Sequence, residues 1–201
     1  MITIEFLLEN EHEIDDIAKK LESDDIKYLI SLLNEKKDKI RYTAFLVLQS
    51  RSKLYSDVYT YWEDFSQKLN SSNSYQRSIG IMLIAENIRW DEQNKFEEIA
   101  DIYLSNCDDE KFITARQTIQ SISKWILYKK SLLPLVINKL ISIDISKRKD
   151  SQQKLLLLDI IAILSEIHKI QPSSDILEYV FGVTTGGILD SKAIKQVKKL
   201  F

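Results

Sequence analysis

The stretch from Tyr75 to Trp90 decides the fold, and it reads YQRSIGIMLIAENIRW. Arg77 stands near its start, and the residues at 3, 6, 7 and 10 positions after this arginine are Gly80, Leu83, Ile84 and Asn87. Residues with this spacing lie on one face of an α-helix. The stretch therefore predicts a helix that begins with a basic residue and turns one side inward.

The same pattern recurs three more times along the chain. Arg41, Arg116 and Lys154 take the place of Arg77, and successive basic residues are separated by 36, 39 and 38 positions. Three sets of inward positions follow these basic residues. The residues three positions after them are Ala44, Gly80, Ile119 and Leu157, and those six positions after them are Val47, Leu83, Ile122 and Ile160. The residues seven positions after them are Leu48, Ile84, Ser123 and Ile161. Helical units with such a period are typical of repeat arrays. We expect four antiparallel helix pairs, with these four helices on the inner side.

The composition favours an all-α protein. The chain has 201 residues, 44% of them apolar, so it is long enough to bury a core as a single domain. Four glycines and two prolines leave few residues for tight β-turns. Leucine, lysine and glutamate, which are good helix formers, are abundant.

We interpret residues 1–201 as one solenoid domain, with an N-terminal cap at 1–23, four helix pairs at 24–169 and a C-terminal cap at 170–201. The last cap is inferred from the helix that contains Lys154, because its outward positions Leu155, Leu158 and Ile163 are apolar as well. A helix that is apolar on all sides needs cover on more than one side. The residues expected to cover it are Ala193, Ile194, Val197 and either Leu200 or Phe201.

Two residues that usually interrupt helices are expected inside them. Pro134 is predicted in the first turn of a helix, where the missing N–H would have no intrahelical partner. Gly80 lies in the middle of a helix, where glycine costs about 1 kcal/mol relative to alanine. Its presence there predicts a close approach of two backbones.

Three helix boundaries follow from the apolar spacing. One helix is expected at 11–22 and the third inner helix at 111–130. Near the C-terminus, a short helix is expected to end at Phe181, and the GVTTGG segment at 182–187 is expected to form a turn.

The sequence gives no sign of a membrane protein. No window contains eighteen consecutive apolar residues, and the first residues carry acids where a signal peptide needs bases. We expect a cytoplasmic protein without membrane contact. Cys107 is the single cysteine, and it has no nearby thiol or histidine to share a metal, so we interpret it as a structural residue.

Charge is distributed unevenly, although the net charge is only −2. Residues 1–25 carry nine acids and two bases, whereas residues 111–154 carry ten bases and two acids. One interpretation is a solvated surface that keeps the protein in solution. The other is a docking surface for an acidic partner, or head-to-tail pairing of two copies through these oppositely charged segments.

The pattern at 24–169 resembles HEAT repeats, whose helix pairs have an acid in the turn and a basic residue at the start of the inner helix. Arg41, Arg77, Arg116 and Lys154 match the basic position. The acid is matched less regularly: Glu35 and Glu110 precede their arginines by six residues, and Asp150 precedes Lys154 by four. The resemblance implies a right-handed α-α superhelix whose inner helices form a concave face. In that family the concave face usually binds protein and sometimes nucleic acid.

The four basic residues have two interpretations. They either bond turn acids and carbonyls of their own or the adjacent repeat, as the resemblance implies, or form a ligand-binding row for phosphates or an acidic helix. The outward positions that face a partner under a binding hypothesis are polar and mixed. Tyr42, Ser78 and Gln117 stand one residue after the basic residue of their repeat. Gln49 and Lys124 stand eight residues after it.

Asp159 is an acid within a strongly apolar helix, so it needs a cation or water. A structural pair with Lys154, Lys124 or Arg116 is expected. The alternative is a functional carboxylate, because a group of HEAT-like alkylation-repair DNA glycosylases uses an acid with tryptophans on the concave face. The tryptophans here are Trp62, Trp90 and Trp125, and core packing is the usual role at their positions.

No catalytic motif is present. His12 and His168 are far apart, and no metalloprotease, catalytic-triad or phosphate-loop pattern occurs. We therefore expect no catalytic residues, metal or cofactor, and a non-enzymatic scaffold that binds a protein or peptide. The alternative function is nucleic-acid binding by the basic third and fourth repeats. The candidate binding residues are Tyr42, Gln49, Arg77, Arg116, Gln117, Lys124, Lys154 and Asp159.

Overall fold

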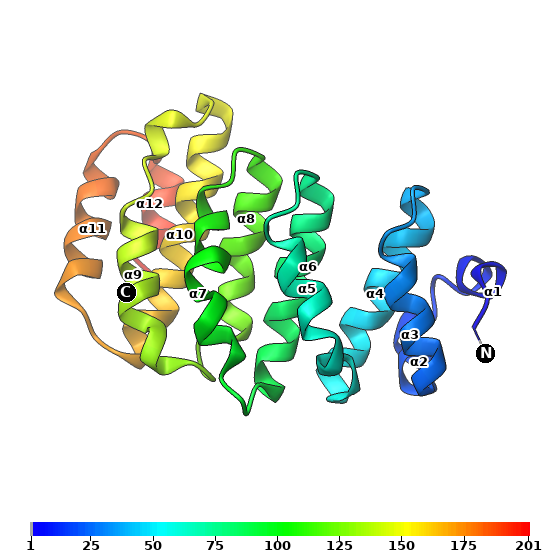
Figure 1. Cartoon of the computed structure of the whole chain (residues 1–201). Coiled ribbons are helices and arrows are strands. Elements are labelled where there is room, and N and C mark those ends of the chain that lie inside the picture. The colour runs from blue at the N-terminus through cyan, green and yellow to red at the C-terminus, as the bar shows by residue number, and fades with distance from the viewer. Residues whose placement is uncertain (1) are drawn as a thin grey trace. The chain divides into compact units, whose positions relative to one another are not determined.

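The computed structural model describes residues 2–201, which form twelve α-helices and six 3-10 segments but no strand (Figure 1). The all-α prediction is confirmed. The chain divides into two compact units, one that ends at Ile102 and one that comprises Tyr103–Phe201. They are called the N-terminal unit and the C-terminal unit below. The interpretation of 1–201 as one solenoid domain stays a prediction.

The N-terminal unit contains two helix pairs preceded by two short helices. Its elements are α1 (Ile4–Glu9), α2 (Ile14–Lys19), α3 (Ser23–Leu32), α4 (Asp38–Leu54), η1 (Asp57–Tyr61), α5 (Trp62–Lys68), α6 (Ser74–Asn87) and η2 (Ile88–Trp90). Helix α7 (Lys95–Ser105) begins in this unit and ends in the next.

Helix α4 is the centre of the N-terminal unit, because α1, α2, α3, η1 and α6 all pack against it (Figure 1). The two inner helices α4 and α6 lie side by side, and α6 pairs closely with α5. Gly80 explains this closeness, since a Cβ atom there would lie 2.7 Å from the carbonyl oxygen of Phe65. The predicted backbone approach at Gly80 is confirmed.

The C-terminal unit contains the remaining elements. They are η3 (Asn106–Asp108), α8 (Phe112–Ser121), η4 (Ile122–Lys124), η5 (Lys130–Leu132), α9 (Leu133–Ile141), η6 (Ile145–Lys147), α10 (Asp150–Ile170), α11 (Ser174–Thr185) and α12 (Ser191–Val197). Helix α10 is the centre here and contacts α8, α9 and α11 (Figure 1). Pro134 stands in the first turn of α9, as predicted.

The predicted inward positions are buried, with one exception. Of the twelve residues that stand three, six or seven positions after a basic residue, eleven are buried, but Ser123 is exposed. The reason is local, because α8 ends at Ser121 and the next residues adopt the tighter 3-10 geometry. A tighter helix changes the angle between successive side chains and turns Ser123 outward.

Three predicted boundaries are wrong. Helix α2 spans only Ile14–Lys19, because Glu22 adopts an extended conformation and caps α3. The third inner helix does not reach residue 130, since its last turn becomes η4. Helix α11 continues past Phe181 to Thr185, and the turn follows at Gly186 and Gly187.

The C-terminal cap covers α10 only in part. Ala193 and Val197 are buried and Ile194 is half-buried, as expected for cover. Leu200 and Phe201 stay exposed, and so does Leu155 on α10. Within residues 2–201, no helix is both long and apolar enough to cross a membrane.

Candidate functional site

The basic residue at the start of each inner helix in the N-terminal unit holds its own turn. Arg41 is buried and donates to the carbonyl oxygen of Glu35 at 2.9 Å and to the carboxylate of Asp38 at 2.5 Å. Arg77 is half-buried and donates to the carbonyl oxygens of Ser71 and Ser72 at 2.7 and 3.3 Å. These contacts satisfy carbonyls that the turn leaves open. The structural interpretation of these two arginines fits the geometry.

In the C-terminal unit, the equivalent residue bonds a different helix. Arg116 on α8 donates to both carboxylate oxygens of Asp159 on α10, through Nε at 2.5 Å and Nη2 at 3.2 Å. Gln120, one turn further along α8, donates to the same carboxylate at 2.9 Å. The hydrogen bond that Arg116 donates to Asp159 raises the pKa of the Arg116 guanidinium, so the arginine stays charged. Asp159 therefore has the structural partner that the sequence predicted.

Lys154 also reaches a different element. Its ammonium lies 2.5 Å from Asp190, which caps α12 by accepting from the backbone N–H of Ala193. The hydrogen bond from Lys154, with that N–H, lowers the pKa of Asp190. The pair connects the inner helix α10 to the C-terminal cap.

The exposed side of the N-terminal inner helices carries two tyrosines. Tyr42 on α4 and Tyr75 on α6 are 61% and 65% exposed. The guanidinium of Arg41 lies between these helices, 5.4 Å from the centre of the Tyr75 ring and next to Tyr42 in the chain. Gln49, two turns further along α4, is half-buried. The surface is thus aromatic, with a fixed cation beside it.

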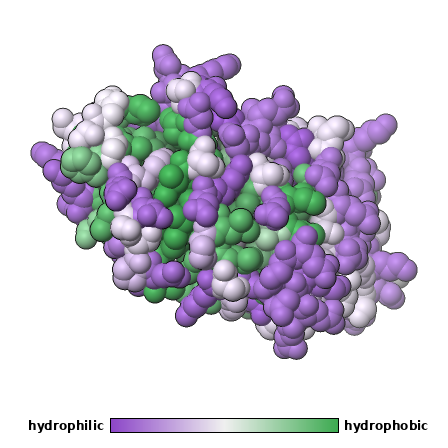
Figure 2. All heavy atoms as spheres, turned by 60° about the vertical axis from the view of Figure 1, so that its left-hand side comes forward, coloured by the Kyte–Doolittle hydropathy of each residue, from purple (hydrophilic) through white to green (hydrophobic). Residues whose placement is uncertain are grey.

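The exposed side of the C-terminal inner helices is more apolar. Figure 2 brings forward the left-hand side of Figure 1, where α11 lies, and on this face apolar side chains reach the surface in bands bordered by hydrophilic ones. Ile113 on α8 is 60% exposed, and Leu155 on α10 is exposed as well. Gln117 on α8 and Lys124 on η4 are half-buried. Ile113, Gln117 and Leu155 belong to α8 and α10, the two helices that the Arg116–Asp159 pair joins.

The structure groups the candidate residues by unit. Tyr42, Gln49 and Arg77 belong to the adjacent helices α4 and α6. The other candidates belong to the C-terminal unit, where Arg116 and Asp159 are bonded directly: Arg116, Gln117, Lys124, Lys154 and Asp159.

Two exposed residues of these faces were missed by the sequence analysis, namely Tyr75 and Ile113. Tyr75 stands two residues before Arg77 and Ile113 three residues before Arg116, and the predicted outward positions all follow the basic residue. An α-helix turns by about 100° per residue, so Tyr75 and Ile113 lie within roughly 60°, measured around the helix axis, of the outward position that directly follows the basic residue. The helical period was therefore a sufficient signal to find them.

Half of the ten bases in the basic segment at 111–154 form ion pairs within the C-terminal unit. The pairs are Lys111 with Glu110, Arg116 with Asp159, Lys147 with Asp144, Arg148 with Asp108, and Lys154 with Asp190. A base in an ion pair is a weaker contact for a phosphate, because the pair must first be broken.

The tryptophans contribute to packing. Trp62 and Trp125 are buried, and the Trp125 ring meets Tyr103 edge to face at 6.0 Å between centroids. Trp90 is half-buried and donates its Nε1–H to the carbonyl oxygen of Ser52 at 2.7 Å. Cys107 is buried, and burial raises the pKa of its thiol to about 12. A thiol with such a pKa is a poor nucleophile at neutral pH.

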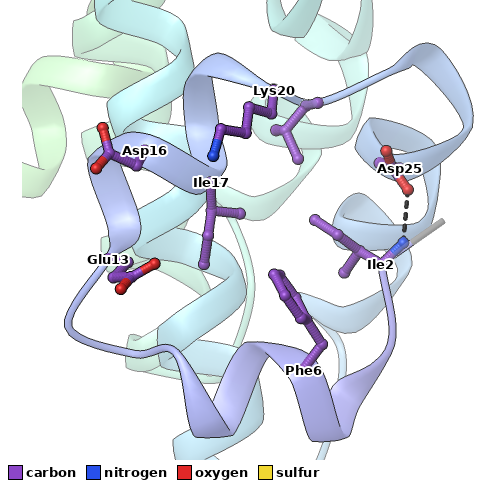
Figure 3. Close-up of a pocket in the computed structure, with 8 residues that line it drawn as sticks. Ile2, Phe6, Glu13, Asp16, Ile17, Lys20 and Asp25 are labelled. Carbon is purple, nitrogen blue, oxygen red and sulfur yellow. Dashed lines mark hydrogen bonds between the residues drawn. The ribbon is translucent and has the colours of Figure 1, made fainter.

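A pocket of about 240 Å³ lies between α1, α2 and α3 at the start of the chain (Figure 3). Ile2, Phe6 and Ile17 point toward its centre, whereas Glu13 and Asp16 stand on its rim. Asp25 closes one side and accepts from the backbone N–H of Ile2 at 2.7 Å. Lys20 lines the pocket as well, so the pocket is apolar inside and carries both acids and a lysine around it.

Comparisons with protein-family models, with curated proteins and with solved structures give no match to this chain. The site is therefore interpreted from its own geometry.

Proposed function

We propose that the chain is a non-enzymatic, cytoplasmic HEAT-like module that binds a protein or peptide along its inner helices. The observation that carries this proposal is the pair of exposed tyrosines, Tyr42 and Tyr75, beside the fixed guanidinium of Arg41. The basic residues that hold the turns and the adjacent inner helices support the HEAT-like assignment. The single buried cysteine suits a reducing compartment.

The chemistry of this surface suits a protein partner. Tyrosine and arginine are enriched among the residues that contribute most to protein interfaces. A tyrosine has few rotatable bonds, so it buries a large ring at a low cost in entropy. Arg41 is already ordered by Glu35 and Asp38, so the partner would meet a rigid surface.

The double variant Tyr42→Ala/Tyr75→Ala tests the proposal. Both side chains are exposed, so we expect an unchanged helical circular dichroism spectrum and a change in Tm of at most a few degrees. A photo-crosslinking residue at position 42 should trap a partner from extract, and purified partner should bind the double variant at least about tenfold more weakly.

The matched control is Phe181→Ala, which removes an aromatic side chain of 72% exposure from α11. Its affinity for the trapped partner should equal that of the wild type. Equal binding by the wild type and the double tyrosine variant would exclude this surface as the binding site.

The nucleic-acid alternative has less support, because five bases of the third and fourth repeats are in ion pairs and two of the three tryptophans are buried. A titration with duplex DNA at increasing salt separates the two functions. We expect no binding at physiological salt. A steep fall of affinity with salt would indicate phosphate contacts and would favour the alternative.

A further inference from the structure

The two ends of the chain carry opposite net charges. Four lysines lie near the C-terminal end, namely Lys192, Lys195, Lys198 and Lys199, and all are exposed. Among residues 2–201, no carboxylate forms an ion pair with any of the four. The same segment ends with Leu200 and Phe201, and Phe201 is 43% exposed. This end is therefore basic, with exposed apolar side chains.

The start of the chain has the complementary character. Residues 1–25 carry nine acids and two bases. Glu13 and Asp16 stand on the rim of the pocket, which Lys20 also lines, and Asp16 forms an exposed ion pair with Lys19 at 3.0 Å. An ion pair at the surface contributes little free energy, so its acid can exchange partners. Phe6 within the pocket is 45% exposed. Cavities of about 150 Å³ are known to hold a benzene ring, so a pocket of about 240 Å³ has room for a phenyl group.

The spacing of the charges agrees as well. Glu13 and Asp16 are three residues apart at the start of α2, and Lys195 and Lys198 are three residues apart at the end of α12. Each pair therefore spans about one helical turn. Two lysines on one helix can face two acids on the other.

We propose that two copies of this chain associate head to tail, with Phe201 of one copy in the pocket of the next and with Lys195 and Lys198 facing Glu13 and Asp16. The apolar ring gains burial, and the ion pairs set the orientation. The contact joins two different surfaces, so it produces either a closed ring or an open chain of copies. The charge pairs are at the surface, so salt weakens the association.

Charge reversal tests the pairing in full-length protein. Wild type should show a sedimentation coefficient that rises with concentration at low salt, and an association constant that falls at least about tenfold when salt is raised from about 0.05 M to about 0.5 M. Glu13→Lys/Asp16→Lys and Lys195→Glu/Lys198→Glu should each be monomeric. An equal mixture of these two double variants should associate again, because each now carries the charge that the other needs.

The apolar part of the contact has its own test. Phe201→Ala should weaken self-association at least about tenfold, while Phe181→Ala should leave it unchanged. Circular dichroism of each variant confirms that the helices remain. A wild type that stays monomeric at every concentration at low salt would overturn the proposal. So would a mixture of the two charge-reversed variants that fails to associate.

Discussion

The two units bury different kinds of side chain at equivalent positions of their repeats. Ten residues after the basic position, the inner helices of the N-terminal unit carry Arg51 and Asn87. In the C-terminal unit the equivalent residues are Ile126, in the turn that follows η4, and Leu164 on α10. All four side chains are buried. At this position the N-terminal unit thus uses polar side chains between its helices, and the C-terminal unit uses apolar ones.

Arg51 contacts several groups at once. It donates to the carbonyl oxygens of Ala18 and Lys19 at the end of α2, at 2.8 and 3.2 Å, and it forms an ion pair with Asp57 at 2.6 Å. Its guanidinium also lies 3.8 Å from the ring centre of Tyr55. A cation suits the end of a helix, where carbonyls are left open and the dipole is negative. Arg51 therefore fixes α2 on α4.

Asn87 makes a similar connection one repeat later. Its amide donates to the hydroxyl of Ser52 on α4 at 2.9 Å and to the carbonyl oxygen of Leu83 at 2.8 Å. Such bonds have required directions, so they permit only one register between α4 and α6. Apolar contacts at Ile126 and Leu164 have no such directions and tolerate changes of shape.

The largest expected effect tests this comparison at equivalent positions. Arg51→Met removes a buried cation and leaves two carbonyls and Asp57 without their donor, so we expect a loss of about 3–5 kcal/mol in the free energy of unfolding. Leu164→Met changes only shape, and we expect a loss below about 1.5 kcal/mol. Urea unfolding followed by circular dichroism measures both. Equal losses would show that the polar and apolar contacts are equivalent.

A smaller effect is expected at the starts of the inner helices. Asp159→Asn leaves the half-buried Arg116 without its acid, and we expect a loss of about 1–2 kcal/mol in the free energy of unfolding. The matched variant is Asp38→Asn in the N-terminal unit, where the acid is 80% exposed and Arg41 keeps its bond to the Glu35 carbonyl. There we expect a loss below about 1 kcal/mol. A larger loss in Asp38→Asn than in Asp159→Asn would contradict the comparison.

The smallest effect concerns Asp25 and depends on pH. Burial raises the pKa of this carboxyl group, but the N–H groups of Ile2 and Glu22 outweigh burial and lower it. A lowered pKa in the folded state means that Asp25 stabilises the fold above the unfolded pKa of about 3.9 and loses that effect as pH falls through the folded value. We expect Asp25→Asn to cost about 1 kcal/mol at pH 7 and less at acid pH. Denaturation of both proteins at a series of pH values provides the measurement, and a cost that stays constant across the series would exclude the carboxylate as its source.

Much of the fold could be read from helical spacing. The inward positions that contain Ala44, Leu83 and Ile160 are buried as predicted, because a spacing of three and four residues fixes one face of a helix whatever it packs against. The outward positions were predicted less well, because Tyr42 is exposed but Gln117 is half-buried and Ser78 is buried. The ends of helices were harder to predict. The change to 3-10 geometry at Ile122, where Ser123 bonds the carbonyl of Gln120, depends on local competition for hydrogen bonds.

The candidate site was predictable in its residue types but not in its contacts. The sequence pointed to Arg116 and Asp159 as polar groups that need partners, and it gave three possible cations for the acid. Only packing decided that these two residues, 43 positions apart, lie within bonding distance. The apolar pocket at Phe6 and Ile17 had no signal in the sequence, because three short helices must meet before it exists.

By itself, the sequence determined that the chain is helical, which sides of the inner helices are buried and where the basic residues stand. These properties are local, since they depend on the helical period and on the burial of apolar side chains. The tertiary structure decided the partner of each basic residue: carbonyls of the same turn for Arg41 and Arg77, and carboxylates of other elements for Arg116 and Lys154. A hydrogen bond requires an acceptor within about 3 Å, and segments distant in the sequence meet at that range only after the helices have packed.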